Sequence, residues 1–369
     1  MRVVIAPDSF KGSLTAVDVA SALAAGWHDA RPDDEIQLAP LADGGEGTLV
    51  AIEAAGGWSW ASVPATDPIG RPVTARWLLS EDGTRAVVEL AEASGLSRLG
   101  MAEREPLGAS TLGTGEVLRA VIDAGIRSIT LGIGGSATTD GGAGILRALG
   151  AELTAEAIHL AGLDPRLAGI DLRIACDVTN PLLGPTGAAA TYGPQKGAAP
   201  GDVAVLDARL AAYAERLIAA TGRDERLTPG AGAAGGTAFG LLSIANRFRS
   251  VTLVPGVEVV MEETGLERKL AGADLVLTGE GRIDAQTAFG KTALGVAKRA
   301  HAAGVRCIAI GGGVEPAGEA VLWEVGAITF AIGEGPQSLE AAMAAGTAPV
   351  ERCGRRLARL MSLGPTATR

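Results

Sequence analysis

The stretch that decides the fold is Val3-Val-Ile-Ala-Pro-Asp-Ser-Phe-Lys-Gly-Ser-Leu-Thr15. Its first four residues are apolar and predict a buried strand, and the polar residues that follow predict a loop. A helix is then expected over about 15–29, because Thr15 is a good N-cap and Asp18 follows three residues later, as in a capping box. The stretch therefore predicts one strand-loop-helix unit of an α/β protein.

The same rhythm returns next to this unit and again near the C-terminus. A strand over 35–39, a glycine-rich loop and a helix over 48–55 follow directly, and consecutive units of this kind predict a parallel sheet. After residue 274 the predicted elements are strands at 275–277, 306–310 and 327–331, and helices at 292–303, 316–325 and about 338–361. Both chain ends are therefore expected to build one sheet.

The middle of the chain has a different pattern. Apolar and polar residues alternate over 73–78 and again over 86–90, with Asp82-Gly83 between them, which predicts an antiparallel hairpin. The predicted fold is α/β with two α/β domains. One is a doubly wound parallel sheet of the flavodoxin or Rossmann kind, from residues 1–57 plus 265–369, and the other is an inserted mixed α/β domain over 58–264.

Composition limits the possible functions. The 369 residues include 53 Gly and only 12 aromatic residues, and 32 basic against 42 acidic residues give a net charge of −10. This charge argues against a general electrostatic grip on nucleic acid or on a membrane surface. Three scattered cysteines offer no zinc-binding spacing, and no apolar run is typical of a signal peptide or a membrane span. We expect a cytoplasmic protein.

The loop after the first strand brings together Asp8, Ser9 and Lys11. It precedes a helix, so it is expected at the carboxyl edge of the sheet, where open α/β sheets bind ligands. A compact ammonium group beside Gly12 suits phosphate or carboxylate oxygens. The structural alternative is a turn followed by a cap, in which Asp8 only ends the strand.

The second loop, Asp43-Gly-Gly-Glu-Gly-Thr48, places two carboxylates among three glycines. One glycine normally suffices for a turn, so this composition favours a bound metal-phosphate or substrate hydroxyl. A plain glycine turn with an aspartate is the alternative.

A third loop, Gly132-Ile-Gly-Gly-Ser-Ala-Thr-Thr-Asp-Gly-Gly142, joins a predicted strand to a helix. Its glycines and hydroxyls suit oxyanions at a helix N-terminus. The residues expected to hold a nucleotide are Gly134, Gly135, Ser136, Thr138, Asp140, Gly141 and Gly142. The same stretch fits the loose Gly-x-Gly-x-x-Ala pattern of dinucleotide-binding proteins. The structural alternative is a hydroxyl-rich loop that closes the helix, and Thr114 is interpreted as a simple helix cap.

Two further segments carry charges beside glycine. Asp177 follows another predicted strand in Cys176-Asp-Val-Thr-Asn-Pro181, and Lys196 lies in a long Gly/Pro loop. The segment Thr278-Gly-Glu-Gly-Arg-Ile-Asp284 and the residues after it precede a predicted helix. They include four charged side chains, Glu280, Arg282, Asp284 and Lys291. That composition suits Mg²⁺ and phosphate together, although Ala285 stands where a Walker A loop has its first glycine. A salt-bridged structural loop is the alternative.

Taken in order, five segments resemble the signature sequences of the class I glycerate kinase family. They are Ala6–Ser13, Leu41–Thr48, Gly132–Gly142, Cys176–Pro181 and Thr278–Asp284. The resemblance spans nearly the whole chain. It implies a kinase that transfers the γ-phosphoryl group of ATP to D-glycerate with Mg²⁺, usually to 2-phosphoglycerate or, as often named, the 3-phospho isomer, in a cleft between two α/β domains.

Residue roles follow from the chemistry of phosphoryl transfer, which needs alignment and neutralised phosphate charge. Lys11 and Lys291 are candidates to contact the transferred group, and Asp43 or Asp177 to orient the attacking hydroxyl. Arg282 or Lys196 is expected to bind the substrate carboxylate, and Asp8 and Ser9 are further substrate-binding candidates. Glu280 or Asp284 is expected to hold Mg²⁺.

Other functions remain open from the sequence. The dinucleotide pattern allows an NAD-dependent dehydrogenase of a small hydroxy acid, and a kinase of another small sugar acid or a non-catalytic sensor is also compatible. The sequence does not reveal the oligomeric state.

Overall fold

In the computed structural model, residues 1–289, 292–333, 335 and 338–363 are described. The chain divides into two compact units. Unit 1 consists of Met1–Asp43, Val50–Gly56 and Val260–Arg369, and unit 2 consists of Gly44–Leu49 and Gly57–Val259. The predicted boundaries keep all of 1–57 in the doubly wound domain, whereas here the short segment Gly44–Leu49 groups with unit 2.

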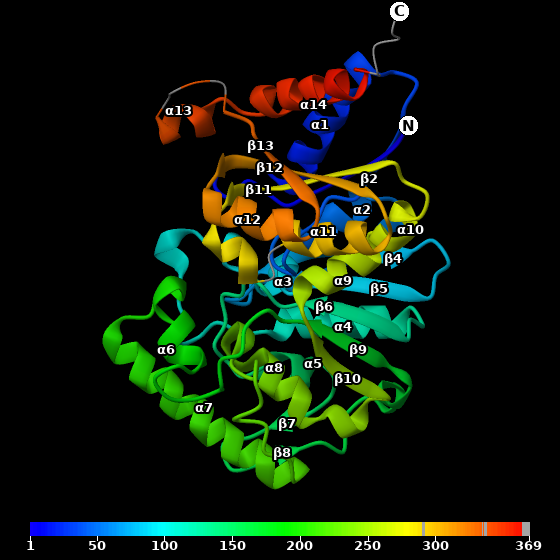
Figure 1. Ribbon diagram of the computed structural model, residues 1–369. Helices are drawn as coiled ribbons and strands as arrows, with labels where there is room; N and C mark the ends of the chain where they lie inside the picture. The colour runs from blue at the N-terminus through cyan, green and yellow to red at the C-terminus, as the bar shows by residue number, and fades with distance from the viewer. Residues whose placement is uncertain (290–291, 334, 336–337, 364–369) are drawn as a thin grey trace, which may run out of the picture. The chain divides into compact units, whose positions relative to one another are not determined.

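Unit 1 contains a parallel five-stranded sheet in the order β13-β12-β11-β1-β2 (Figure 1). Renumbered within the unit, this is the flavodoxin-like order 2-1-3-4-5. Both chain ends build the sheet, as predicted. Its strands are β1 (Arg2–Pro7), β2 (Glu35–Leu38), β11 (Leu275–Ile283), β12 (Arg306–Val314) and β13 (Ala327–Ala331).

Helices cover both faces of this sheet, so the unit is doubly wound. In Figure 1, α1 and α14 lie together on one face while α11 and α12 lie on the other. The helices are α1 (Ala16–Ala30), α2 (Thr48–Ala54), α9 (Gly256–Glu263), α10 (Leu266–Leu270), α11 (Thr292–Ala302), α12 (Pro316–Glu324), α13 (Leu339–Ala344) and α14 (Ala348–Met361); α2 and α9 each begin in unit 2.

Local sequence explains the start of α1 and its packing. Thr15 and Asp18 form the predicted capping box, with Thr15 Oγ1 accepting from the backbone N–H of Asp18. A Cβ at Gly26 would lie 1.9 Å from the carbonyl oxygen of Glu351, so only glycine lets α1 and α14 approach this closely. The single final helix predicted near 338–361 is wrong, because the chain turns at Gly346 with φ +61° and starts again as α14.

Unit 2 contains a mixed six-stranded sheet in the order β10-β9-β6-β5-β4-β3. β10, β9, β6 and β5 are parallel, whereas β4 pairs antiparallel with both β5 and β3, which confirms the predicted hairpin. The strands are β3 (Trp58–Thr66), β4 (Pro72–Ser80), β5 (Arg85–Glu89), β6 (Ser128–Gly132), β9 (Asp171–Ala175) and β10 (Ser250–Val254); β7 (Glu152–Leu153) and β8 (Ile158–His159) form a small separate hairpin.

The helices of unit 2 pack around one apolar core that includes Leu131, Ile145, Leu172 and Phe239. They are α3 (Ala91–Ser94), α4 (Leu112–Asp123), α5 (Ala143–Ala148), α6 (Ala188–Tyr192), α7 (Pro200–Thr221) and α8 (Ala233–Ser243). Thr114 lies inside α4 and donates to Ser94 Oγ at 2.8 Å, so its predicted role as a cap is wrong.

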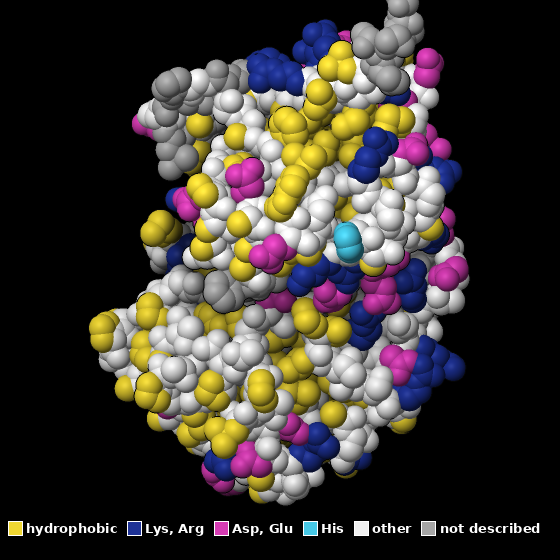
Figure 2. Space-filling model, in the orientation of Figure 1, with side chains coloured by type: hydrophobic (Ala, Val, Ile, Leu, Met, Phe, Trp, Pro, Cys, Tyr) yellow, Lys and Arg dark blue, Asp and Glu magenta, His cyan; other side chains and the backbone are white. Residues whose placement is uncertain are grey.

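Surface and helix composition agree with the charge of the chain. On the face shown in Figure 2, acidic and basic side chains are interspersed within each unit, rather than gathered in one broad basic patch. Among the described residues, no helix has both the length and the apolar character needed to cross a membrane.

Candidate active site

The sheet of unit 1 has a topological switch point between β1 and β11, where the chain proceeds toward opposite edges of the sheet. In open α/β sheets, ligands bind at the carboxyl ends of the strands at such a point. Pro7 is in register with Gly279, and the backbone N–H of Asp8 donates to the Gly279 carbonyl oxygen at 2.8 Å. Asp8 therefore directly follows β1, and Glu280 lies in β11, next to the residue paired with Pro7, so both are at the switch point.

Asp8 is held by its own loop and by α11. Its Oδ2 accepts from Thr292 Oγ1 at 2.5 Å, and its Oδ1 accepts from the backbone N–H of Ser9 at 2.6 Å. Burial raises the pKa of Asp8, the two hydrogen bonds oppose that rise, and the negative charge of Asp43 adds to it. A carboxylate that is costly to keep charged is a good partner for an incoming cation.

Glu280 is the most buried of the predicted metal ligands, with 8% of its surface exposed. Its Oε1 accepts from Thr287 Oγ1 at 2.9 Å, and Asp284 Oδ1 accepts from the backbone N–H of Gln286 at 2.8 Å. Arg282 is exposed and forms ion pairs with Glu315 and, at 3.6 Å, with Asp284. A substrate carboxylate would have to compete with these two acids for the guanidinium group.

Lys11 lies near the same two strands. Its Nζ is 3.5 Å from Asp43 Oδ2, and both side chains are largely exposed. A Cβ at Gly281 would lie 3.2 Å from the Cα of Phe10 and 3.3 Å from the Lys11 nitrogen, so Gly281 allows the Lys11 loop to approach β11. Unit 1 thus brings together Asp8, Ser9, Lys11, Asp43 and Glu280, while Lys291 falls outside the described residues.

The carboxylates at the switch point of unit 1 fit an Mg²⁺ ion that is bound together with ATP. Within the described part of the chain, no group of three or more His, Cys, Asp or Glu side chains is arranged to hold a metal. Protein-bound Mg²⁺ with a nucleotide typically uses only one or two carboxylates, the remaining ligands being phosphates and water. Glu280 and Asp8 can supply such carboxylates at the switch point.

In unit 2, two of the predicted ligand loops contact each other. The backbone N–H of Gly134 donates to the Gly44 carbonyl oxygen at 3.4 Å. A Cβ at Gly134 would lie 2.4 Å from the Cα of Gly45, and one at Gly132 would lie 2.8 Å from the Gly44 oxygen. Close backbone packing therefore explains the two glycines of the dinucleotide-like pattern, which removes the main support for a dehydrogenase.

Asp140 satisfies the start of α5 by itself. Its Oδ2 accepts from Thr111 Oγ1, the Thr111 N–H and the Gly144 N–H at 2.9–3.1 Å, and its Oδ1 accepts from the Gly142 N–H at 3.1 Å. Gly141 and Gly142 have positive φ values of 68° and 77°, which allow the chain to turn around this carboxylate. The backbone N–H groups that we expected to bind an oxyanion thus donate to the carboxylate of Asp140 instead.

Lys196 is buried beneath the same loop, with 2% of its surface exposed. Its Nζ donates to Ser136 Oγ at 2.8 Å and to the Thr138 carbonyl oxygen at 2.6 Å. Burial lowers the pKa of Lys196 to about 7, against the attraction of Asp140. The described contacts of Lys196 Nζ are therefore with Ser136 and Thr138, and its role as a carboxylate clamp stays a prediction.

Asp177 also has a structural partner. Its Oδ1 accepts from the backbone N–H of Gly256 at 2.8 Å, at the first residue of α9. A carboxylate at a helix N-terminus is stabilised by the helix dipole. Its placement gives Asp177 a capping role, in contrast to Asp43 beside Lys11.

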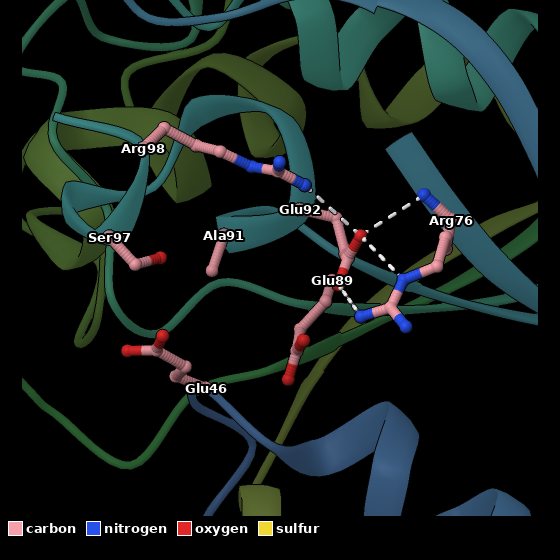
Figure 3. Close-up of a pocket in the computed structure, with 7 residues that line it drawn as sticks. All are labelled: Glu46, Arg76, Glu89, Ala91, Glu92, Ser97 and Arg98. Atoms are coloured by element: carbon pink, nitrogen blue, oxygen red, sulfur yellow. Dashed lines mark hydrogen bonds and ion pairs between the residues drawn. The ribbon is translucent and has the colours of Figure 1, made fainter. Parts of the chain in front are cut away.

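The structure shows a polar pocket in unit 2 that the sequence patterns did not predict. Figure 3 shows this cavity of about 270 Å³, in which the Glu92 carboxylate lies between the guanidinium groups of Arg76 and Arg98. Glu89, at the carboxyl end of β5, is buried and accepts from the Thr48 N–H at 2.8 Å. That bond ties the segment Gly44–Leu49 to unit 2.

Glu89 is the most unusual acid of this pocket. Burial raises its pKa to about 8, the N–H of Thr48 opposes the rise, and the negative charges of Glu92 and Glu46 add to it. Perturbed carboxyl groups in clefts are often functional. The available signal in the sequence was an acid directly after three apolar residues of a predicted strand, which we interpreted only as part of a hairpin.

Comparison with known proteins identifies the family of the chain. The model of the glycerate kinase family matches residues 3–362. A glycerate kinase of Halalkalibacterium halodurans is 42% identical, with 96% of this chain and 97% of that protein covered. A glycerate 2-kinase of Escherichia coli is 43% identical, with 80% and 81% covered.

A solved structure shows the same architecture. It is a crystal structure from Salmonella typhimurium LT2, assigned as a glycerate kinase 2, with a TM-score of 0.83 and 40% identity over 98% of both chains. Sequence and fold thus match this family along nearly their full length. The chain belongs to the glycerate kinase family of phosphotransferases.

Proposed function

We propose that this protein phosphorylates D-glycerate with the γ-phosphoryl group of ATP and forms 2-phosphoglycerate. The observation that carries the proposal is the switch point of unit 1, where the loop after β1 supplies Asp8 and Lys11 and the neighbouring strand β11 supplies Glu280. The family membership of the chain and the names of its relatives support glycerate as the acceptor.

Glu280 and Asp8 are the proposed ligands of Mg²⁺, with Asp284 as the alternative partner of Glu280. When bound, the ion would neutralise phosphate charge and align the triphosphate. Lys11 is exposed, so its ammonium group can exchange Asp43 for a phosphoryl oxygen. An ammonium group that meets charge developing in the transition state lowers the barrier without any covalent step.

For the acceptor, Arg282 is the proposed carboxylate clamp because Lys196 is buried. Asp43 is the proposed partner of the attacking hydroxyl, since Asp177 caps a helix. Lys291 keeps its predicted role beside the transferred group. The polyphosphate role of the 132–142 loop, the interdomain cleft and the cytoplasmic location also stay predictions.

The test is phosphorus NMR of a reaction that contains the protein, ATP, Mg²⁺ and D-glycerate. The proposal predicts stoichiometric ADP and a monoester signal coupled to the proton on C2. Coupling to the C3 protons would assign the 3-phospho isomer instead. Parallel reactions with other short sugar acids test the acceptor, and no ADP release with any of them would reject a kinase.

A further inference from the structure

Besides the polar pocket of Figure 3, unit 2 contains a second cavity, of about 340 Å³. It lies between α5, α7, β7 and the loop that precedes α4. It shares no residue with the pocket of Figure 3, and only Thr139 and Asp140 come from the 132–142 loop. Of the residues predicted to bind a nucleotide, only Asp140 lines this cavity, and its carboxylate already accepts hydrogen bonds from the chain itself.

The charge of this cavity is opposite to that of the protein. Its charged lining residues are Arg147, Arg209, Arg216 and Asp140, which give three positive charges and one negative. Within the described part of the chain, none of the three arginines has a carboxylate within ion-pairing distance. The carboxylate of Asp140 is already surrounded by backbone and hydroxyl donors.

Two of these arginines each donate a hydrogen bond to a backbone carbonyl and keep further N–H donors for a ligand. Arg209 donates through one terminal nitrogen to the Leu107 carbonyl oxygen at 2.8 Å, and Arg216 donates to the Ala155 oxygen at 3.0 Å. A guanidinium group has five N–H donors, so each keeps a fork suited to two oxygens of one anion. Arg209, Tyr213 and Arg216 lie on one face of α7 because they are spaced by four and three residues.

The floor of the cavity carries unmet hydrogen-bonding capacity. The hydroxyl groups of Thr139 and Tyr213 and the Nε of Arg216 are buried and have no hydrogen-bond partner among the described residues. Buried polar groups without partners are costly. A ligand oxygen that meets one of these groups as the cavity adjusts around it would recover part of that cost.

The remaining walls are apolar. Leu107, Leu153, Leu206 and Leu210 line the cavity together with alanines. A cavity with two excess positive charges and an apolar wall matches a dianionic head group on a compact apolar body. We propose that this cavity is a binding site for a small phosphate ester, separate from the site of phosphoryl transfer.

The test is isothermal titration of the full chain with phenyl phosphate, inorganic phosphate, benzoate and benzyl alcohol. Phenyl phosphate should bind most tightly, with a dissociation constant below about 1 mM, because it alone offers both the dianion and the apolar body. Added salt should weaken its binding, as for any partly exposed ion pair.

Two variants locate the binding. Arg147→Gln should weaken phenyl phosphate binding several-fold; the Arg147 side chain donates no hydrogen bond to a described residue, so the fold should persist. The double change Arg209→Gln with Arg216→Gln should weaken binding by at least about tenfold. Arg247→Gln is the matched control, because Arg247 is an exposed arginine of the same unit outside the cavity.

Three results would overturn the proposal. They are no phenyl phosphate binding at 10 mM ligand (about ten times the expected constant), unchanged affinity in both variants with normal melting curves, and displacement by Mg-ATP. The last would make the cavity part of the donor site. Retained binding under saturating Mg-ATP, lost in the variants, supports it whether or not the protein phosphorylates glycerate.

Discussion

Replacing Glu89 by glutamine should change how the stability of the protein depends on pH. Glutamine keeps an oxygen that can accept from the Thr48 N–H but cannot ionise. In the folded protein the pKa of Glu89 is raised to about 8 from an ordinary value of 4.5, mainly by burial. Glu89 therefore keeps its proton in the folded state at pH values where it has lost it in the unfolded state.

The sign and size follow from proton linkage. Between pH 4.5 and 8 the folded state binds more protons than the unfolded state, so the contribution of Glu89 to stability falls as pH rises. It is fully present below pH 4.5 and is lost as pH rises through about 8. The folded and unfolded pKa values of Glu89 differ by about 3.5, and each pKa unit corresponds to about 1.36 kcal/mol. The contribution of Glu89 to the free energy of unfolding is therefore at most about 5 kcal/mol.

The assay is urea unfolding of the wild type and of Glu89→Gln at pH 5, 6, 7 and 8, followed by tryptophan fluorescence. Trp58, Trp60 and Trp77 report on unit 2. The variant should gain stability relative to the wild type with each step, by a few kcal/mol in total. Glu81→Gln, which removes an exposed carboxylate of the same unit outside the pocket, is the control. Parallel curves for the wild type and Glu89→Gln would refute a protonated Glu89.

Four further outcomes are expected. Lys11→Ala should lower kcat by roughly 10²–10³ with unchanged circular dichroism, while the exposed Lys298→Ala should not; equal turnover would remove Lys11 from the site. Excess chelator should abolish ATP-dependent turnover and added Mg²⁺ should restore it, so full activity in chelator would reject the metal. The pKa of Lys196 is lowered to about 7 from 10.5, so between these pH values the unfolded state binds more protons than the folded state. The wild type should therefore gain stability relative to Lys196→Met from pH 7 to pH 10.5, as measured by urea unfolding at both ends of this range. Gly134→Ala should destabilise unit 2 by about 1–3 kcal/mol in the same assay, because its Cβ would lie 2.4 Å from Gly45 Cα.

Much of the fold was predictable because its signals are local. The Thr15 cap depends only on Asp18 three residues away, and the apolar runs at 3–6 and 275–277 identify buried strands wherever they finally pair. The strand-helix order then leaves few possible topologies, since parallel crossovers are almost always right-handed. Family motifs, in turn, are patterns of neighbouring residues.

The roles of particular charged residues depended on contacts between distant parts of the chain. Lys196 and Ser136 are 60 residues apart, and Glu89 meets Thr48 across 41 residues. Whether a lysine in a glycine loop is exposed or buried depends on which loop covers it, and this is decided only when the sheet forms. The strands, the cap and the chemical class of the site were therefore encoded locally, whereas burial and pairing of the charges were decided by tertiary structure.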